Sequence, residues 1–317
     1  MLDPKFFLAS VGETSWIPQV VVVRDGGAIR GIVYAKERKL RGFATGILYA
    51  DATLDSMVAA AAGDRERIFQ IGVAALMKRR GVWALRMLVP PDGFCLDALR
   101  EGRSTDFDCG EVENHCYVPL PGDYNSFLEG LGTNTRRNFR YYRRRFSDAG
   151  HQYVPRLTLE EFAKAAAHLA TKSVTGTDQA GIKRALDMFA VSSRPMLAGL
   201  RHRDGQWLSV VGGWYTGETA TVFCQMNDDR DYKESSLSLV MRGYLIEELI
   251  SRQIHRLCFW AGVGGALSRY RVAIPAVKVY LDKRSIAWRA IRGLFTSMAP
   301  LFPKRKSWIS EWIARGE

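Results

Sequence analysis

The sequence predicts an α/β protein made of two similar units in tandem. Two glycine turns, Asp25-Gly26 and Asp204-Gly205, each lie between runs rich in β-branched and aromatic residues, which is the pattern of a β-hairpin. In both halves a helical pattern and a further strand follow the hairpin, at nearly the same separation along the chain. The recurrence indicates a duplicated α/β unit, because its period is far too long for a solenoid.

The N-terminal unit has four predicted elements. Residues 16–25 and 29–37 form the hairpin. Residues 64–80 form a helix that begins at an aspartate N-cap and is followed by a glycine, and residues 82–89 form the next strand. The apolar side chains at helical spacing are Ile68, Ile71, Ala75 and Leu76.

The C-terminal unit repeats this order with one more strand. Residues 195–202 and 207–215 form its hairpin, and residues 219–227 form a further strand. A strong helical pattern covers residues 235–252, before a last strand over residues 254–260. The apolar stripe of that helix consists of Leu237, Val240, Met241, Tyr244, Leu245 and Leu249.

An arginine-rich helix is predicted between the two units. A short helix over residues 124–130 precedes it, and the stretch 133–150 ends at a glycine in the C′ position. Its apolar stripe is Phe139, Tyr142 and Phe146. We expect a structural helix with an anion-facing surface. A nucleic-acid reader is the alternative, although no zinc finger, RNP sequence or helix-turn-helix spacing accompanies the arginines, so DNA is not the expected partner. The arginines are Arg136, Arg137, Arg140, Arg143, Arg144 and Arg145.

Composition fits a globular protein with anionic partners. The 317 residues are 47% hydrophobic and carry a formal net charge of +12, which favours nucleic acid, membrane headgroups, nucleotide cofactors or an acidic carrier protein. No apolar run is long enough to span a membrane, and the N-terminus lacks the features of a secretion signal. The five cysteines include no CxxC pair, so we expect a reduced, cytoplasmic protein without structural zinc.

Three stretches resemble one group of enzymes. "FLEGLGTNTRRNFRYYRRRFSDAG" resembles a segment of FemAB-like and cellulose-biosynthesis-associated (CelD-like) acyltransferases, and residues 201–263 resemble their C-terminal transferase core. "SRYRVAIPAVKVYL" is similar to their final strand, which commonly has an aromatic-basic pair. The resemblance covers residues 16–281 and implies two tandem GNAT-like units, each with a mixed, mostly antiparallel sheet flanked by helices.

The resemblance also implies an acyl transfer. An acyl group would pass from a thioester, acyl-CoA or acyl carrier protein, to an amine or hydroxyl, with no tightly bound cofactor and no metal. One feature departs from the group: the loop at residues 232–238 lacks the usual glycine. A carrier protein or an aminoacyl-tRNA therefore remains an alternative to acyl-CoA, and a basic binding module without catalysis is the alternative outside the enzyme class.

The expected donor site lies at the start of the 235–252 helix. Free N–H groups at a helix N-terminus can hold a pyrophosphate, although serines there can equally act only as caps. The expected phosphate-binding residues are Lys233, Ser235, Ser236, Leu237 and Ser238. In GNAT-like enzymes the acyl arm lies against the preceding strand where it parts from the next one. The residues expected to line that place are Phe223, Cys224 and Gln225.

The proton-handling and substrate-binding residues are less sharply indicated. Tyr270 is a candidate acid, His255 a candidate base, and Gln225 a polar residue in an apolar strand. Cys224 and Cys258 are expected to be buried thiols rather than nucleophiles. Asp228, Asp229 and Asp231 are solvated turn residues or orient a substrate amine. The basic residues expected to bind an acidic substrate or carrier are Arg136, Arg137, Arg140, Arg271 and Lys278.

We expect four segments along the chain: a first unit over residues 1–123, the arginine-rich segment over 124–152, the catalytic unit over 153–283 and a basic amphipathic tail over 284–317. The tail has tryptophans beside lysines and arginines. Such a segment can lie in a membrane interface or can pack on the protein core. The first alternative implies peripheral contact with the inner face of the membrane.

Overall fold

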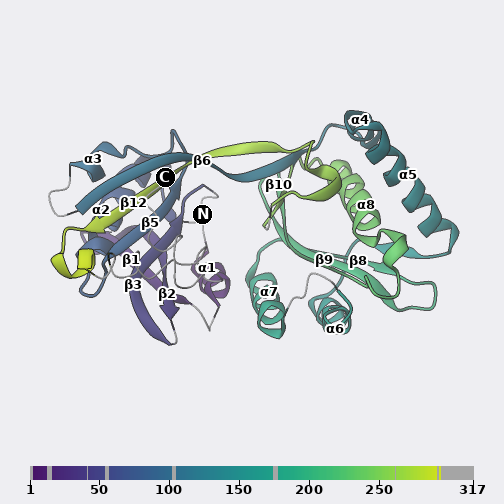
Figure 1. The fold of residues 1–317 in the computed structure, drawn as a ribbon, viewed down its shortest axis with the longest axis horizontal. Helices are drawn as coiled ribbons and strands as arrows, with labels where there is room; N and C mark the ends of the chain where they lie inside the picture. The colour runs from purple at the N-terminus through teal and green to yellow at the C-terminus, as the bar shows by residue number, and fades with distance from the viewer. Residues whose placement is uncertain are drawn as a thin grey trace. The chain divides into compact units, whose positions relative to one another are not determined.

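The computed structural model describes residues 3–12, 16–40, 42–53, 57–101, 105–173, 178–260, 262–290 and residue 293. The chain forms two compact units (Figure 1). The first contains Met1–Asn114 together with Pro275–Glu317, and the second contains His115–Ile274. These boundaries differ from the expected ones, because the arginine-rich segment belongs to the second unit and the strand beyond residue 275 belongs to the first.

The first unit is a sheet with helices packed on both faces. Strands β1, β2 and β3 pair in antiparallel order, β3 pairs in parallel with β5, and β5 pairs antiparallel with β12. Its elements are α1 (Pro4–Val11), β1 (Trp16–Asp25), β2 (Ala28–Leu40), β3 (Phe43–Asp51), β4 (Val58–Ala60), η1 (Ala62–Asp64), α2 (Arg65–Lys78), β5 (Ala84–Val89), α3 (Asp97–Arg100), the first part of β6 (Thr105–Pro119) and most of β12 (Val272–Lys283).

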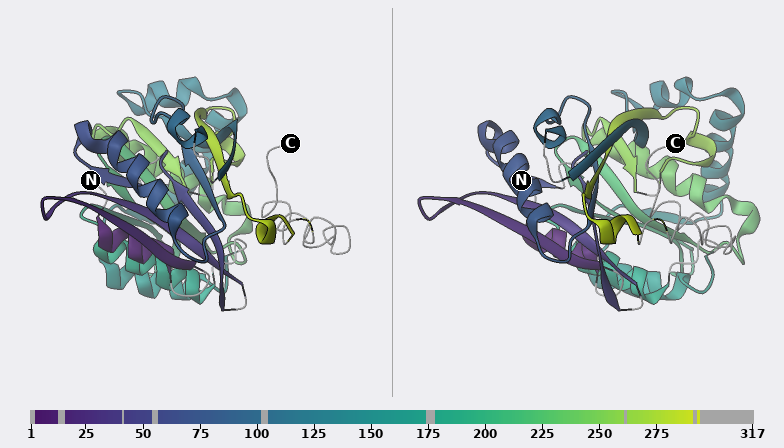
Figure 2. Two further views of the ribbon diagram at one scale, coloured as in Figure 1. Left: turned by 90° about the vertical axis from the view of Figure 1, so that its left-hand side faces the viewer. Right: turned by 60° about the vertical axis from the view of Figure 1, so that its left-hand side comes forward.

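Helix α2 covers one face of the β1–β2 hairpin (Figure 2). Ile68 and Leu76 are buried in the core with Val33, as expected, but Ile71 is 40% exposed because it lies on the opposite side of the helix. Gly72 allows the close approach of α2 to β2, since a Cβ there would lie 2.2 Å from a methyl group of Val33. Tyr34, the next residue along β2, packs on α1 at the other face.

The second unit has the same design with more helices. Its sheet has the order β6-β11-β10-β9-β8-β7, with β10 and β11 parallel and the other described pairs antiparallel. Helices α5 and α8 lie together on one face, and α6 and α7 lie on the other (Figure 1). Its further elements are α4 (Tyr124–Gly130), α5 (Thr133–Asp148), β7 (Gln152–Val154), α6 (Leu159–Leu169), α7 (Gln179–Val191), β8 (Pro195–Arg201), β9 (Trp207–Thr216), β10 (Thr219–Asn227), η2 (Lys233–Ser235), α8 (Leu237–Ser251), β11 (Arg256–Phe259) and η3 (Gly265–Leu267).

The predicted repeat is confirmed and is more complete than the sequence indicated. The series β1-β2-β3-α2-β5 and β8-β9-β10-α8-β11 have the same order and the same pairings, including a parallel pair joined by a helix. In each unit, the strand that pairs next to the last strand of the series follows the other series in the sequence. After β5 the chain continues into β6, whose end pairs with β11, and after β11 it continues into β12, which pairs with β5. This exchange of last strands explains the observed boundaries between the units.

A buried ion pair fixes the exchanged strand β12 in the first unit. Nη2 of Arg86 lies 2.8 Å from Oδ1 of Asp282, and the two side chains are 4% and 2% exposed. The indole Nε1 of Trp288 donates to the same oxygen at 3.2 Å. Two charges so far from water must satisfy each other, because a lone buried charge is very costly.

We expect Arg86→Met to lower the free energy of unfolding by about 3–5 kcal/mol, because it leaves the Asp282 carboxylate buried without its partner. The double variant Arg86→Met with Asp282→Leu should recover much of this loss. Urea unfolding followed by far-ultraviolet circular dichroism measures both. A single variant as stable as the wild type would contradict this role.

Candidate functional site

The sheet of the second unit opens along the end of β10. β10 and β11 are paired in parallel from Thr219 to Val222, and the backbone N–H of Trp260 donates to the carbonyl of Val222 at 2.8 Å at the end of this ladder. On the other edge the register with β9 shifts between Val222 and Cys224, which makes Phe223 the extra residue of a β-bulge. Bulges bend strands and are common beside active sites. Beyond Val222, β10 continues to pair with β9 on one edge, and the described residues provide no strand on its other edge.

The matching place in the first unit is closed. β3 and β5 stay paired from Ile47 to Asp51 without a register shift, and the N–H of Ala52 still donates to β5 at 2.7 Å. Helix α2 begins with Asp64 and Glu66, whose negative charges oppose an anion at that helix end. The second unit is therefore the better candidate for a site at the parallel pair.

Helix α8 begins with three backbone N–H groups that have no protein acceptor within the described residues, those of Ser236, Leu237 and Ser238. Ser236 has φ 46° and ψ 46°, a left-handed conformation, directly after Ser235 in the right-handed turn η2. Such a pair of residues turns successive N–H groups toward one point and forms an anion-binding nest. The left-handed conformation costs a non-glycine residue about 1–2 kcal/mol. Ser236 thus adopts the conformation that a loop glycine would favour.

Gln225 connects the open strand to this helix end. Its Nε2 lies 3.4 Å from the carbonyl oxygen of Ser238 and 3.2 Å from Oδ1 of Asn227, while its Oε1 accepts from Nε of Arg242 at 3.4 Å. Asn227 in turn accepts from the Ser209 hydroxyl at 2.7 Å. The network holds the strand and the first turn of α8 in one arrangement.

The loop between β10 and α8 is held by charge. Nζ of Lys172 lies 2.7 Å from a carboxylate oxygen of Asp228 and 2.7 Å from one of Asp231, and Asp228 is buried. The hydrogen bond from Lys172 lowers the pKa of Asp231, so the carboxylate of Asp231 remains charged at neutral pH. The two aspartates therefore help to hold the loop in place. Asp231 is an exposed turn residue, whereas Asp228 is buried.

Phe223 lies in a group of aromatic rings on the α7 side of the sheet. Its ring centroid is 5.9 Å from that of Trp214, 5.8 Å from that of Trp260 and 6.3 Å from that of Phe189. Burial raises the pKa of the neighbouring Cys224 thiol to about 12. Burial likewise raises the pKa of Cys258 to about 11. Both thiols therefore stay protonated at neutral pH, which disfavours them as nucleophiles.

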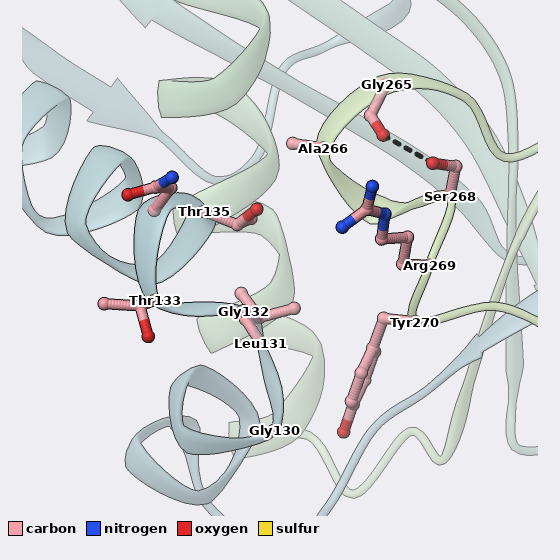
Figure 3. Close-up of a pocket in the computed structure, with 11 residues that line it drawn as sticks. Gly130, Leu131, Gly132, Thr133, Thr135, Gly265, Ala266, Ser268, Arg269 and Tyr270 are labelled. Atoms are coloured by element: carbon pink, nitrogen blue, oxygen red, sulfur yellow. Dashed lines mark hydrogen bonds between the residues drawn. The ribbon is translucent and has the colours of Figure 1, made fainter.

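A pocket of about 420 Å³ lies between the start of α5 and the turn η3 (Figure 3). Tyr270 lines it and packs edge-on against Phe127, with ring centroids 5.4 Å apart. Gly130 permits this packing, since a Cβ there would lie 2.7 Å from the tyrosine ring. Burial raises the pKa of Tyr270. Arg269 and the hydroxyls of Thr133 and Thr135 add polar groups to the walls.

The arginines of α5 divide into two kinds. Arg143 turns inward to Glu247 of α8 and lies 4.8 Å and 4.1 Å from the ring centroids of Tyr124 and Tyr244. The others have no carboxylate partner in the described part of the chain, namely Arg136, Arg137, Arg140, Arg144 and Arg145. Four of these arginines, with Thr133 and the exposed Tyr141, line a groove of about 370 Å³. Thr133 also belongs to the Tyr270 pocket, so the two hollows adjoin.

The remaining expected residues are not gathered at this site. His255 is exposed in the connection after α8, at the opposite end of a helix that is about 22 Å long, so it lies far from Ser236. Arg271 is exposed in the second unit, whereas Lys278 belongs to β12 in the first unit, where its Nζ lies 5.2 Å from the ring centroid of Tyr280. Sequence reasoning also missed Arg242, although a lone arginine inside an apolar helix is a visible signal.

Two expected absences concern metals and membranes. Among the described residues no group of three or more His, Cys, Asp or Glu side chains could hold a metal ion. The described helices include none that is long and apolar enough to cross a membrane. The tail beyond residue 293 lies outside the described residues, so its membrane contact stays a prediction, as does the cytoplasmic location. Trp288, which precedes it, is buried against Ile47 and Ala84.

Comparisons with known proteins define the fold. No family model matches the chain, and no curated protein matches it. Among solved structures, FemX has a TM-score of 0.56 at 10% identity, covering 84% of this chain and 88% of FemX. The chain has the fold of FemX. L-PGS from Bacillus licheniformis has a TM-score of 0.54 at 12% identity, covering 91% of this chain and 95% of L-PGS.

A third structure agrees with these two. The C-terminal domain of a protein named as a lysylphosphatidylglycerol synthetase, from Agrobacterium fabrum, has a TM-score of 0.57 at 12% identity, covering 90% of this chain and 88% of that domain. Identities this low show the fold alone. With the repeat described above, they confirm tandem GNAT-like units in a mixed, mostly antiparallel α/β arrangement. The CelD-like part of the resemblance stays a prediction.

The two kinds of arginine on α5 should differ in their effect on stability. We expect Arg143→Ala to lower the free energy of unfolding by about 1–3 kcal/mol, because it removes an ion pair and two cation–π contacts. The double variant Arg140→Ala with Arg144→Ala should stay within about 0.5 kcal/mol of the wild type. Thermal and urea unfolding of the three proteins test this. Equal losses in both variants would contradict the division.

Proposed function

We propose that the protein is an acyltransferase whose active site is the opening of β10 in front of the α8 N-terminus. The observation that carries this proposal is the coincidence of two features. β10 has a bulge at Phe223 and leaves β11 after Val222, and the helix that follows begins with free N–H groups at Ser236. An acyl donor whose amide-bearing arm is joined to a pyrophosphate needs both features, a cradle for its phosphates and an open strand edge for its arm.

Each residue expected at the donor site has a role in this proposal. The N–H groups of Ser236, Leu237 and Ser238 hold the pyrophosphate, and Lys233 and Ser235 stand beside them in η2. The donor's arm lies along Phe223, Cys224 and Gln225, where backbone groups of β10 pair with it. A backbone N–H there also polarises the thioester carbonyl, since donors fixed in place stabilise the oxyanion of acyl transfer.

Tyr270 is the proposed general acid. An acid must hold its proton at working pH, and burial raises the pKa of this tyrosine. It would protonate the thiolate that leaves the donor. His255 is not assigned a catalytic role, because the structure places it at the other end of α8.

The donor class is tested by isothermal titration with acetyl-CoA and a longer acyl-CoA. We expect saturable binding that Ser236→Asp weakens about tenfold or more, because a carboxylate beside a pyrophosphate is repelled. Ser236→Gly is the matched control. It suits the left-handed conformation, so it should keep the affinity and raise the free energy of unfolding by about 0.5–1 kcal/mol. No binding of either donor to the wild-type protein would exclude acyl-CoA.

An aminoacyl-tRNA is the second candidate donor, in line with the FemAB-like resemblance. The groove of unpaired arginines with Tyr141 favours it, because guanidinium groups bind phosphates and an exposed ring can stack on a base. Lysylphosphatidylglycerol synthetase, a protein of the same fold, is named for an aminoacylated product.

A gel shift with unfractionated tRNA decides between the donors. Here we expect the Arg140→Ala, Arg144→Ala double variant to weaken binding and to lower its salt dependence by about two charges. Binding that this variant leaves unchanged would exclude the groove as the tRNA site. If neither acyl-CoA nor tRNA binds, an acyl carrier protein as the donor and a basic binding module without catalysis are the remaining candidates.

A further inference from the structure

Arg184, an arginine of α7, stands beside the proposed reaction site. Arg184 of α7 lies with its Cζ 5.5 Å from the ring centroid of Phe223, the bulge residue of β10. Trp214, Phe223 and Trp260 form a triangle of rings with centroid separations of 5.8–5.9 Å. Trp260 is 41% exposed, so this group of rings reaches the surface. Arg184 and these rings all belong to the second unit.

The guanidinium of Arg184 lacks an anionic partner in the described structure. Its Nε is buried and makes no hydrogen bond, and no carboxylate of the described chain forms an ion pair with it. The nearest charged neighbours on α7, Lys183 and Asp187, pair with each other at 3.2 Å on the exposed side. Burial alone lowers the pKa of Arg184, without an acidic group that raises it.

Arg242, another partly buried arginine of the second unit, has protein acceptors. Its Nε donates to Gln225 at 3.4 Å and its Nη1 donates to the carbonyl of Gly264 at 3.3 Å. Its side chain therefore has protein acceptors. A buried donor without an acceptor lowers the stability of the fold, and more so when the group is charged. A residue that keeps this cost beside a reaction site is best explained by a ligand that supplies the acceptor.

We propose that Arg184 binds an anionic group, a carboxylate or a phosphate, on the acyl acceptor, while Trp214, Phe223 and Trp260 hold the acceptor's apolar part. This inference rests on the proposed function, because Phe223 lies where the acyl transfer is placed. The planar fork of arginine suits an oxyanion, and its stacking on a ring keeps the fork oriented.

The reaction then runs with the acceptor held at one end. The amine nitrogen attacks the thioester carbon, a carbon–nitrogen bond forms and the carbon–sulfur bond breaks. The amine loses one proton to solvent, and the departing thiolate receives one from Tyr270. The anionic group takes no part in these steps. By binding Arg184, the anionic group determines which amines serve as acceptors.

Three small amines that share an aminoethyl group test the inference in an acetyl-CoA turnover assay. β-Alanine carries a carboxylate, phosphoethanolamine carries a phosphate, and β-alaninamide is neutral. We expect kcat/KM to be about tenfold or more higher for at least one anionic amine than for the neutral one. Arg184→Gln should remove this preference with little change for β-alaninamide, and Arg184→Lys should keep part of it. Lys183→Gln is the matched control, since it removes one exposed charge from the same helix.

Proton–nitrogen correlation spectra of the arginine Nε–H groups measure binding of the amines in the absence of turnover. The resonance that disappears in Arg184→Gln belongs to Arg184, and we expect β-alanine or phosphoethanolamine to shift it while β-alaninamide does not. A shift with one anion and not the other identifies the group that is bound.

The two proposals can fail separately. Acetyl transfer without a charge preference, or an Arg184 resonance that neither anion moves, overturns the role of Arg184 and leaves the acyltransferase intact. A shifted resonance in a protein that binds no acyl donor overturns the proposed function and leaves the anion site.

Discussion

The parallel pairing of β10 with β11 is the constraint on which the rest of the second unit depends. Parallel neighbours need a crossover, and here the crossover is α8. The helix must therefore start at the carboxyl end of β10, so its free N–H groups face the place where that strand leaves its neighbour. The first unit obeys the same constraint with α2, but its pair stays closed and its helix end carries acidic residues. One topology thus gives an open strand end in one copy and a closed strand pair in the other.

The positive charge of the chain serves several purposes. Arg86 and Arg143 are structural, since each has a carboxylate and aromatic partners. The arginines along α5 that have no carboxylate partner among the described residues form a basic groove next to the Tyr270 pocket, which suits a long polyanion. Arg184 stands apart from both kinds, because it lies half-buried beside Phe223 and its buried Nε has no acceptor among the described residues. The contacts that each arginine makes, rather than the number of arginines, distinguish these roles.

Local patterns in the sequence predicted the repeat, the main helices and the serine-rich start of α8, because hairpin turns and helical stripes are written in neighbouring residues. The capping box of Thr158 and Glu161 was also available as a sign of α6. The exchange of β6 and β12 was not predictable, since strand pairing across long separations leaves no periodic signal. The bulge at Phe223 and the isolation of Arg184 depend on tertiary packing. The separation of His255 from Ser236 could have been predicted, because the two residues stand at opposite ends of one helix in the sequence.

The most direct test of the proposed active site is hydrogen–deuterium exchange of the wild-type protein with and without acetyl-CoA. If the donor lies along β10 and ends at α8, the amides of residues 223–227 and 236–238 become protected, and the corresponding amides after β3 and at the start of α2 do not. Protection confined to other parts of the chain, or no protection at a concentration that saturates binding, would contradict the proposal.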